Sequence, residues 1–487
     1  MAQLSAGYRE LRDPTSEVLR WVLRAGFGAV FFLPLVVGSK FFFPFIVLKH
    51  VIFRIIVEGL AVAYVALAMR EPRWRPRWTP LTWAVLAYVG IATLTSFTGV
   101  SLDNSIWGNY ERMGGLVFLW HLGLLFFLLV NCLRDKEDFR FLLTSTVFVA
   151  VLMSLFSFGQ WLNVPFLLRS SGGARLTGTI GNATYLAAYL LFHLFLLAYL
   201  FVRTGQFHPR QFFWSLVGLD AILFAYDLAL RGRPDTVSLF AHLASAPALV
   251  AMLAAVHGGA LLAWLYQRQQ WMTRTFLGAI FLLIFFIFYQ TQTRGAILGL
   301  LLGVLVLAVA ATVLRRGTPV GRLGLAVLAL SVALPVTLYL ARATPLVRGD
   351  PTLQRLTSIS LQDVTSQSRV DTWTASWRGW IEDPVRFLIG YGQENYSVVF
   401  NRHFPPRIFK DLGSQIWFDR AHNIIFDVGV TTGLIGLLSY LAIYAIAVWS
   451  LWRYYLRHRD FLTAAMPVGL LTAYFTQNLF VFDTLDS

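Results

Sequence analysis

An arginine and a histidine stand at the edges of strongly apolar segments, where polar side chains are costly to keep. Arg294 lies in the short connection 290–296 between two apolar runs, and an arginine at membrane depth is usually paired or functional. His422 opens the apolar run 421–450, and its imidazole can accept a proton near neutral pH. The alternatives are that Arg294 only extends toward the lipid headgroups and that His422 only makes structural hydrogen bonds. Together, the two residue types suit anion binding and proton transfer.

Two polar loops add further groups that could bind an anion or form hydrogen bonds. The stretch RSSGGARLTGTIGN contains glycines that let backbone amides approach an anion closely, with Arg175 as a possible anion partner. The alternative is a flexible turn. The loop 101–115, SLDNSIWGNYERMGG, is dense in hydrogen-bonding groups that include Tyr110 and Arg112. The alternative for this loop is a lipid-interface segment that its aromatic residues anchor.

A predicted helix between the apolar runs 320–341 and 421–450 carries another arginine. The segment from Ser366 to Glu382 has the composition of a helix, and Pro384 should end it. Spacings of 4, 4 and 3 residues place four side chains on one face. The alternative is an amphipathic helix that lies on the membrane with its tryptophans at headgroup depth. The four residues are Arg369, Trp373, Trp377 and Trp380.

Long apolar segments must hold these polar residues in place. The chain has 487 residues, of which 57% are hydrophobic and only 13% are charged, whereas a soluble domain is nearer a quarter charged. Backbone groups in lipid must bond within their own segment, so each apolar run of about 20 residues should be a helix. We predict an all-α polytopic integral membrane protein with about 13 transmembrane helices, in a range of about 12 to 14. The expected spans are 19–38, 44–69, 79–98, 113–132, 139–161, 183–203, 211–230, 239–266, 274–292, 295–315, 320–341, 421–450 and 461–482.

The placement of the charges predicts the orientation. The net charge of +15 lies in short clusters between apolar runs, which argues against nucleic-acid binding. With the N-terminus in the cytoplasm and the first span uncleaved, every predicted inner connection is cationic, as the positive-inside rule requires. The single cysteine, Cys132, excludes an intrachain disulfide. We expect an N-terminal bundle of about eleven spans over 1–341, a large periplasmic loop with short amphipathic helices over 342–420, and C-terminal transmembrane helices over 421–487.

Several motifs, taken in order, resemble the bacterial O-antigen ligase and O-antigen polymerase superfamily. The strings TQTRGAILGL, RVDTW, GYGQENY and AHNIIFDVGVTTGLIGLL are similar to its characteristic region, and WGNYERMGG and RLTGTIGNATYLAAYL to upstream motifs. The resemblance covers most of the chain, from Ser101 onward. Members often continue with a further span after the motif similar to QNLFVFDTLDS, whereas this sequence stops at Ser487, so the number of spans and the side of the C-terminus stay open at this point.

The resemblance implies a metal-independent, inverting glycosyltransferase of the bacterial inner membrane that uses no cofactor. The implied donor is a glycan on a polyprenyl diphosphate such as undecaprenyl diphosphate, and the acceptor is a hydroxyl of a glycan, lipid or protein. Arginines would supply charge and paired donors to the leaving diphosphate. The implied catalytic residues are His422, Arg294 and Arg369. The implied substrate-binding residues are Arg175, Asn423, Tyr110, Arg112 and Trp373.

Two other functions remain open at this point. A transporter or flippase of lipid-linked oligosaccharides would use charges inside the spans, and Arg54 and Glu58 are spaced to pair there, as Asp220 and Asp227 are spaced to share a face. No clear internal repeat of the kind many transporters have is present, and the richest polar features lie on one side. The third function is a non-catalytic scaffold for envelope assembly.

Overall fold

Every regular element in the described part of the chain is a helix. The computed structural model describes residues 13–230, 238–358, 364–410 and 417–486, and in these ranges the only extended pairing is an isolated bridge between Gly172 and Arg175. Helices are the expected outcome because lipid cannot hydrogen-bond with the backbone, and a helix satisfies its own backbone groups. The prediction of an all-helical, multi-pass membrane protein is confirmed.

Ten helices in these described ranges are long and apolar enough to cross a membrane. They coincide with predicted spans, but the predicted span 239–266 is divided, because Pro247 begins a new helix after the short α9 (Leu239–Ala244). The ten helices are α2 (Val47–Arg70), α3 (Pro80–Phe97), α6 (Lys136–Trp161), α7 (Ala183–Val202), α8 (Pro209–Leu230), α10 (Pro247–Leu265), α11 (Gln270–Gln290), α12 (Arg294–Leu314), α13 (Pro319–Leu340) and α19 (Ile424–His458).

Three further helices coincide with the other predicted spans but fall short of these ten in length or apolarity. The first, α1 (Pro14–Phe31), carries Glu17 and Arg20 in its first half. The second, α5 (Leu116–Cys132), has only 17 residues, whereas a bilayer crossing takes about 20. The third, α20 (Phe461–Asn478), has 18 residues and a polar end. Helix length and composition therefore support ten of the predicted spans and leave these three as a proposal.

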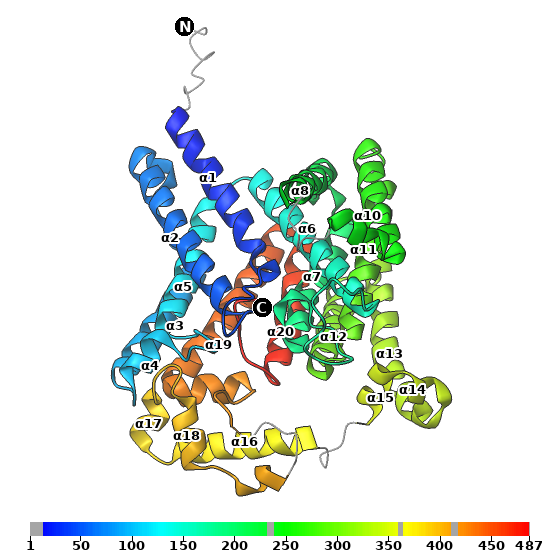
Figure 1. Ribbon diagram of the computed structural model, residues 1–487. Coiled ribbons are helices and arrows are strands. Elements are labelled where there is room, and N and C mark those ends of the chain that lie inside the picture. Colours follow the sequence, from blue (N-terminus) through cyan, green and yellow to red (C-terminus); the bar gives the residue numbers. More distant parts are fainter. Residues whose placement is uncertain (1–12, 231–237, 359–363, 411–416, 487) are drawn as a thin grey trace.

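The long helices form one bundle, and short helices cover one of its ends (Figure 1). We call the end that these short helices cover the loop end, and α1 begins at the opposite end. In α6 and α7, 67% of the most apolar window is buried, whereas in α13, at the margin of the bundle, only 6% is buried. The core therefore forms around α6 and α7, with α11 packed against them.

Glycines bring α12 and α20 into close contact. A Cβ atom added to Gly303 would lie 2.5 Å from the carbonyl oxygen of Gly469, and one added to Gly299 would lie even closer to the carbonyl oxygen of Ala473. The stripe of small residues that follows Arg294 is therefore a helix-packing surface, as its spacing suggests. This contact also sets the depth at which Arg294, the first residue of α12, is held.

We expect Gly303→Ala to lower the melting temperature of the detergent-purified protein. The added methyl group collides with backbone atoms of α20 that cannot move aside, and overpacking costs about 1–3 kcal/mol. The matched control is Gly90→Ala on α3, where an added Cβ meets nothing within 4 Å. Alanine favours a helix over glycine, so this control should be neutral or stabilising. Equal melting temperatures for the two variants would contradict the packing described here.

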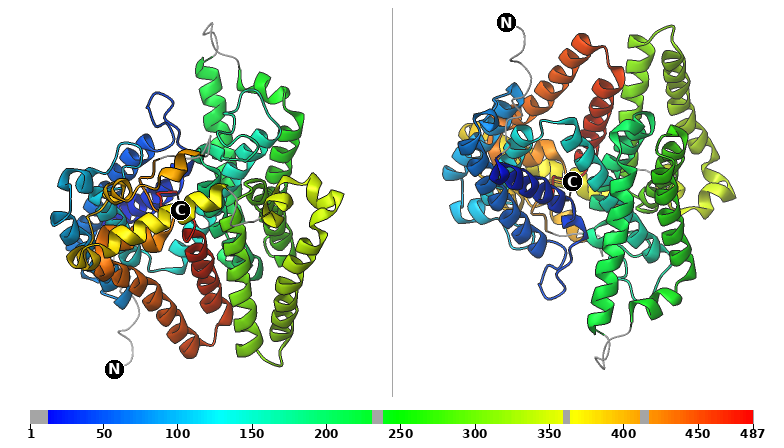
Figure 2. Two further views of the ribbon diagram at one scale, coloured as in Figure 1. Left: turned by 90° about the horizontal axis from the view of Figure 1, so that it is seen from below. Right: turned by 90° about the horizontal axis from the view of Figure 1, so that it is seen from above.

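Five short helices build the loop end. The longest, α16, lies across the end of the bundle (Figures 1 and 2), and its position confirms the helix predicted from 366 to 382. Pro384 does end it, because that proline is the first residue of the next helix. The five are α14 (Pro345–Gly349), α15 (Pro351–Thr357), α16 (Val364–Ile381), α17 (Pro384–Ile389) and α18 (Tyr396–Arg402).

Two of the tryptophans on α16 pack against protein. Trp373 donates its indole N–H to the carbonyl oxygen of Ala421 at 3.1 Å, and Trp380 donates to that of Phe387 at 3.0 Å. Trp380 is buried, whereas Trp377 is 48% exposed. A helix that lies on the membrane with all its tryptophans in the headgroups is therefore the wrong interpretation for this face. Trp373 instead attaches α16 to the segment before α19, and Trp380 attaches it to the segment 384–389.

Candidate functional site

His422 lies in the turn that leads into α19. Its φ of +53° is in the left-handed region that residues other than glycine rarely adopt. Its Nδ1 lies 3.2 Å from the carbonyl oxygen of Arg420. A carbonyl oxygen only accepts, so Nδ1 carries the proton and Nε2 presents a lone pair. Asn423 accepts a hydrogen bond from the backbone N–H of Ile425 at 3.0 Å and thereby caps α19.

Two aromatic rings enclose the imidazole. The centroid of the His422 ring lies 5.5 Å from that of Phe418 and 5.3 Å from that of Phe482, with both rings edge-on. Burial lowers the pKa of His422 to about 4, and the positive charge of Arg369 acts in the same direction. The imidazole is therefore uncharged at neutral pH, with its lone pair ready to accept a proton.

Arg175 joins the glycine-rich loop to the start of α12. Its Nε donates to the carbonyl oxygen of Thr291 and its Nη2 to Oγ1 of Thr293, both at 3.0 Å. Burial lowers the pKa of Arg175 to about 10, and the nearby positive charges of Arg355 and Arg369 contribute to the shift. The loop end therefore gathers like charges from distant parts of the chain.

The guanidinium of Arg369 and the residue after Arg294 both lie beside Phe480. Arg294 donates through Nη2 to Oγ of Ser358 at 3.4 Å. A Cβ atom added to the next residue, Gly295, would lie 3.2 Å from Cβ of Phe480, and the guanidinium of Arg369 lies 5.8 Å from the centroid of that same ring. Two of the predicted catalytic arginines are thus brought to the same corner of the loop end, next to Arg175.

Arg355, which the sequence analysis did not single out, belongs to the same group. It lies on α15, which is fixed by its N-cap Asp350 and by a hydrogen bond of 2.7 Å from Tyr289 to that carboxylate. Its charge acts on Arg175. The only sequence signal was its place in the long outer segment, which it shares with other arginines. We refer to Arg175, Arg294, Arg355 and Arg369 as the arginine group.

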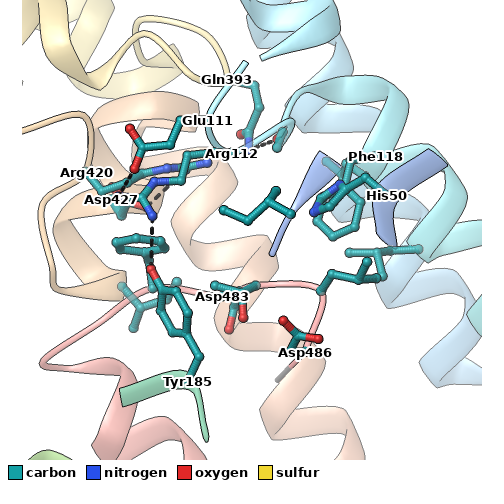
Figure 3. A pocket seen from close by; sticks show the side chains of 18 of the residues that line it. His50, Glu111, Arg112, Phe118, Tyr185, Gln393, Arg420, Asp427, Asp483 and Asp486 are labelled. Atoms are coloured by element: carbon teal, nitrogen blue, oxygen red, sulfur yellow. Dashed lines mark hydrogen bonds and ion pairs between the residues drawn. The ribbon is translucent and has the colours of Figure 1, made fainter. Parts of the chain in front are cut away.

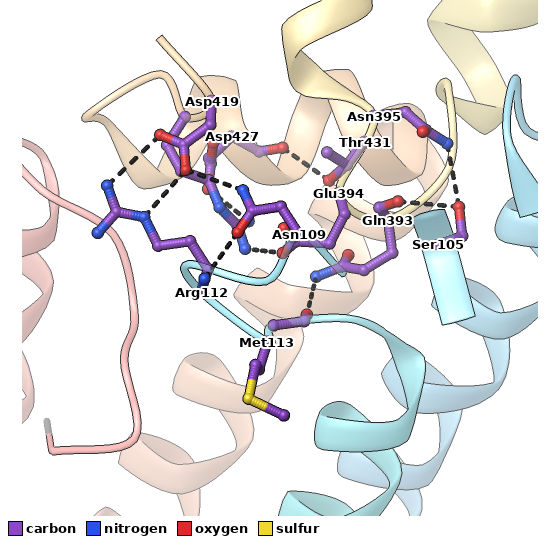
Figure 4. Close-up of polar contacts among 12 residues, drawn as sticks. Ser105, Asn109, Arg112, Met113, Gln393, Glu394, Asn395, Asp419, Asp427 and Thr431 are labelled. Carbon is purple, nitrogen blue, oxygen red and sulfur yellow. Dashed lines mark hydrogen bonds and ion pairs between the residues drawn. The ribbon is translucent and has the colours of Figure 1, made fainter. Parts of the chain in front are cut away.

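Arg112 contacts the segment before His422, whereas Tyr110 packs against Phe43. The Nε of Arg112 lies 2.9 Å from Oδ2 of Asp419, and its Nη1 donates to the Tyr185 hydroxyl at 3.2 Å (Figure 4). Arg112 therefore attaches its own loop to the segment before His422. Tyr110 is 57% exposed, and its ring contacts Phe43 at 5.7 Å between centroids. Arg112 also lies over the ring of Phe482, which contacts His422, so this arginine lies near the imidazole.

A buried cation joins three segments beside His422. Arg420 forms ion pairs with Glu394 and with Asp427, and the latter distance is 3.2 Å. Asp427 also accepts the backbone N–H of Ala421 at 3.0 Å, which fixes the turn before His422. Figure 4 shows these carboxylates next to the Arg112–Asp419 pair. Sequence reasoning missed Arg420, although its place two residues before His422 was a usable signal.

We expect Arg420→Met to destabilise the protein by about 3–5 kcal/mol, because two buried carboxylates would lose their counter-charge. The matched control is Arg402→Met, which breaks an exposed pair with Glu382 and should cost at most about 1 kcal/mol. Thermal unfolding of the purified protein measures both. Adding Glu394→Gln and Asp427→Asn to Arg420→Met should restore much of the loss. A single variant as stable as the control would contradict this role.

The charged side chains inside the predicted spans have polar partners within the helix bundle. Glu58 lies 3.1 Å from Nε2 of His121, and Arg54 donates to the carbonyl oxygen of Met113 at 3.3 Å. The predicted pairing of Arg54 with Glu58 is therefore wrong, because each side chain has a closer partner on or near α5. Asp220 lies 2.9 Å from Nε2 of His257 on α10. Asp227 accepts a hydrogen bond from Ser238 at 3.1 Å, so these carboxylates do not form a continuous polar row.

A cavity of about 280 Å³ lies between α2, α5, α7 and α19 (Figure 3). Phe482 and Arg420 line it, whereas His422, Arg294 and Arg369 do not. The ring of Phe482 thus stands between the cavity and the imidazole. Within the described ranges, no group of three or more histidine, cysteine or acidic side chains is placed to hold a metal ion.

Comparison with known families identifies one part of the chain. Residues 279–441 match the family model described as O-antigen ligase, which confirms the predicted resemblance for this segment. The match includes Arg294, Arg369 and His422, whereas Arg175 and Arg112 lie outside it. No match is found among curated proteins. The chain is thus a multi-pass membrane protein in which residues 279–441 are similar to the O-antigen ligase family, a family of transferases.

Proposed function

We propose that this protein is a membrane glycosyltransferase that moves a glycan from a polyprenyl diphosphate, such as undecaprenyl diphosphate, to a hydroxyl acceptor. The observation that carries the proposal is the arginine group beside an uncharged histidine, with Arg369 close enough to shift the pKa of both Arg175 and His422. Guanidinium groups bind phosphate oxygens through their charge and their paired N–H donors. A diphosphate has the charge and the oxygen atoms for several such contacts.

The proposed reaction is a single displacement. The acceptor hydroxyl oxygen attacks the anomeric carbon, and its proton passes to Nε2 of His422. The bond between the anomeric carbon and the diphosphate oxygen breaks, and its electron pair leaves with the diphosphate. Arg294 and Arg369 stabilise the negative charge that develops there. Attack opposite to the leaving group inverts the anomeric centre.

Other predicted residues have positioning roles in this proposal. Trp373 holds the carbonyl oxygen of Ala421, and Asn423 caps α19, so both fix the backbone on either side of His422. Arg175 holds the backbone of Thr291 and thereby the segment before Arg294. Arg355 adds a fourth cation for the diphosphate.

We further propose that the loop end faces the periplasm and that the N-terminus is cytoplasmic. At the end opposite to the loop, α2 finishes with Arg70, and α12 and α13 are joined through Arg315 and Arg316. Cationic connections of this kind stay on the inner side. With α1, α5 and α20 crossing together with the ten long helices, the chain would span the inner membrane about thirteen times.

Purified protein in detergent, supplied with a labelled lipid-linked glycan and candidate acceptors, tests the function. We expect glycan transfer and release of polyprenyl diphosphate without any membrane gradient. Arg294→Ala, Arg369→Ala and His422→Ala should each reduce transfer by about 100-fold or more. Arg402→Ala, on the exposed side of α18, is the matched control and should retain full activity. Full activity of the Arg294 and His422 variants would refute the mechanism, and gradient-dependent movement of an intact donor would favour a transporter.

The pH dependence of kcat/KM tests the role of His422. The pKa of this histidine is lowered to about 4, so the free imidazole stays neutral down to weakly acidic pH. We expect activity to persist below pH 6 and to fall only as the pH approaches about 4, where the imidazole takes up a proton and can no longer act as a base. A fall centred near pH 6.5, the ordinary histidine value, would contradict the buried, neutral base.

A further inference from the structure

The connection between α2 and α3 is rich in arginine and stiffened by proline. It reads EPRWRPRWT over residues 71–79 and contains the 3₁₀ turn Pro72–Trp74. Pro72 and Pro76 fix the backbone φ at two of its positions. Because α2 and α3 are both long and apolar enough to cross a membrane, this connection lies just beyond the hydrocarbon. It lies at the end of the bundle opposite to the loop end (Figure 1).

Contacts with the end of α5 hold this connection in one shape. The ring of Trp74 is buried, and the guanidinium of Arg134 lies 4.7 Å from its centroid. The same guanidinium donates to the carbonyl oxygen of Arg75 at 3.2 Å. The backbone N–H of Arg77 donates to Oδ1 of Asn131 at 2.6 Å. The backbone that carries Arg75 and Arg77 is therefore fixed before a ligand binds, which lowers the entropic cost of binding.

Two arginines of this connection have no acidic partner. Arg75 and Arg77 are both exposed, and no ion pair joins either guanidinium to a carboxylate among the residues that the structure describes. Glu71, the one acidic residue of the connection, is paired with Arg73. Burial lowers the pKa of Arg134, and the nearby positive charge of Arg77 acts in the same direction. Two further carboxylates at this end of the bundle are already paired, Asp13 with Arg70 (3.0 Å) and Asp135 with Arg20 (3.1 Å).

Two exposed tryptophans adjoin these arginines. The rings of Trp78 and Trp83 stack with their centroids 4.8 Å apart, and the two side chains are 53% and 59% exposed. Trp78 follows Arg77 directly, and Trp83 lies in the first turn of α3. Exposed tryptophans at the end of a membrane-spanning helix are typical of the headgroup level. The connection therefore combines available cations with aromatic rings at the depth of the lipid phosphates.

We propose that Arg75 and Arg77 bind the phosphate of a phospholipid with net negative charge, such as phosphatidylglycerol, whose acyl chains lie against Trp78 and Trp83. Guanidinium groups contact phosphate oxygens through their charge and their paired N–H donors. A basic segment next to a membrane helix attracts anionic lipids. The tryptophans favour a lipid over a free phosphate ion, because only a lipid has acyl chains to contact them. This site is remote from the arginine group and does not depend on the proposed function.

Native mass spectrometry of the delipidated full chain tests the proposal. The probes are phosphatidylglycerol, phosphatidylethanolamine with the same acyl chains, and glycerophosphoglycerol, which is the first headgroup without acyl chains. We expect the wild-type protein to bind phosphatidylglycerol at least about 5-fold more tightly than phosphatidylethanolamine, and to bind glycerophosphoglycerol far more weakly than either. Arg75→Gln combined with Arg77→Gln should weaken the binding of phosphatidylglycerol about 10-fold or more, because two cations near the lipid phosphate are lost.

The matched control is Arg315→Gln combined with Arg316→Gln, which removes the same charge at the same end of the bundle, from the connection between α12 and α13. It should weaken the binding of phosphatidylglycerol at most about 2-fold. Gel filtration checks that each variant is folded, and the comparison of probes on the wild-type protein needs no variant. Equal losses in the two double variants would show a general attraction to basic surfaces and overturn the proposal. Equal binding of the two lipids, or binding of glycerophosphoglycerol as tight as that of the lipid, would also overturn it.

Discussion

The ion pairs of Arg420 with Glu394 and Asp427 hold the candidate site together. They join the segment before α18 to the first turn of α19, and Asp427 also fixes the backbone before His422. Because all three side chains are buried, removing any one leaves charge without compensation in a low-dielectric surrounding. The position of the imidazole therefore depends on charges that do not themselves line the arginine group.

Two regions that differ in charge lie near His422. On one side, Arg175 and Arg369 lie close enough to influence each other, so that corner favours an anion. On the other side, the cations that line the cavity, such as Lys49, are paired with carboxylates such as Asp486 within its wall. In the proposed reaction, the arginines would stabilise the leaving diphosphate, and the acceptor hydroxyl would lie within hydrogen-bond reach of His422.

The pattern of apolar runs in the sequence predicted the long helices, because a run of apolar residues in lipid has few alternatives to a helix. It also predicted α16 and the gathering of Arg294, Arg369 and His422 at one end of the bundle. It did not predict Arg355 or Arg420, whose importance comes from partners far away in the sequence. Composition likewise could not distinguish Trp380, which packs inward, from Trp377, which does not. Tyr110 was predicted to bind substrate because of its polar neighbours in the sequence, whereas in the fold its ring packs against Phe43.

The glycine contact between α12 and α20 has a consequence for biosynthesis. The carbonyl groups that Gly299 and Gly303 approach belong to Ala473 and Gly469, which the ribosome adds long after α12 has been made. Until α20 has been made, the glycine face of α12 lacks its final neighbour. Arg294 stands at the end of this helix, so its final depth is set late. The arginine group therefore completes its assembly only after α20 has packed against α12.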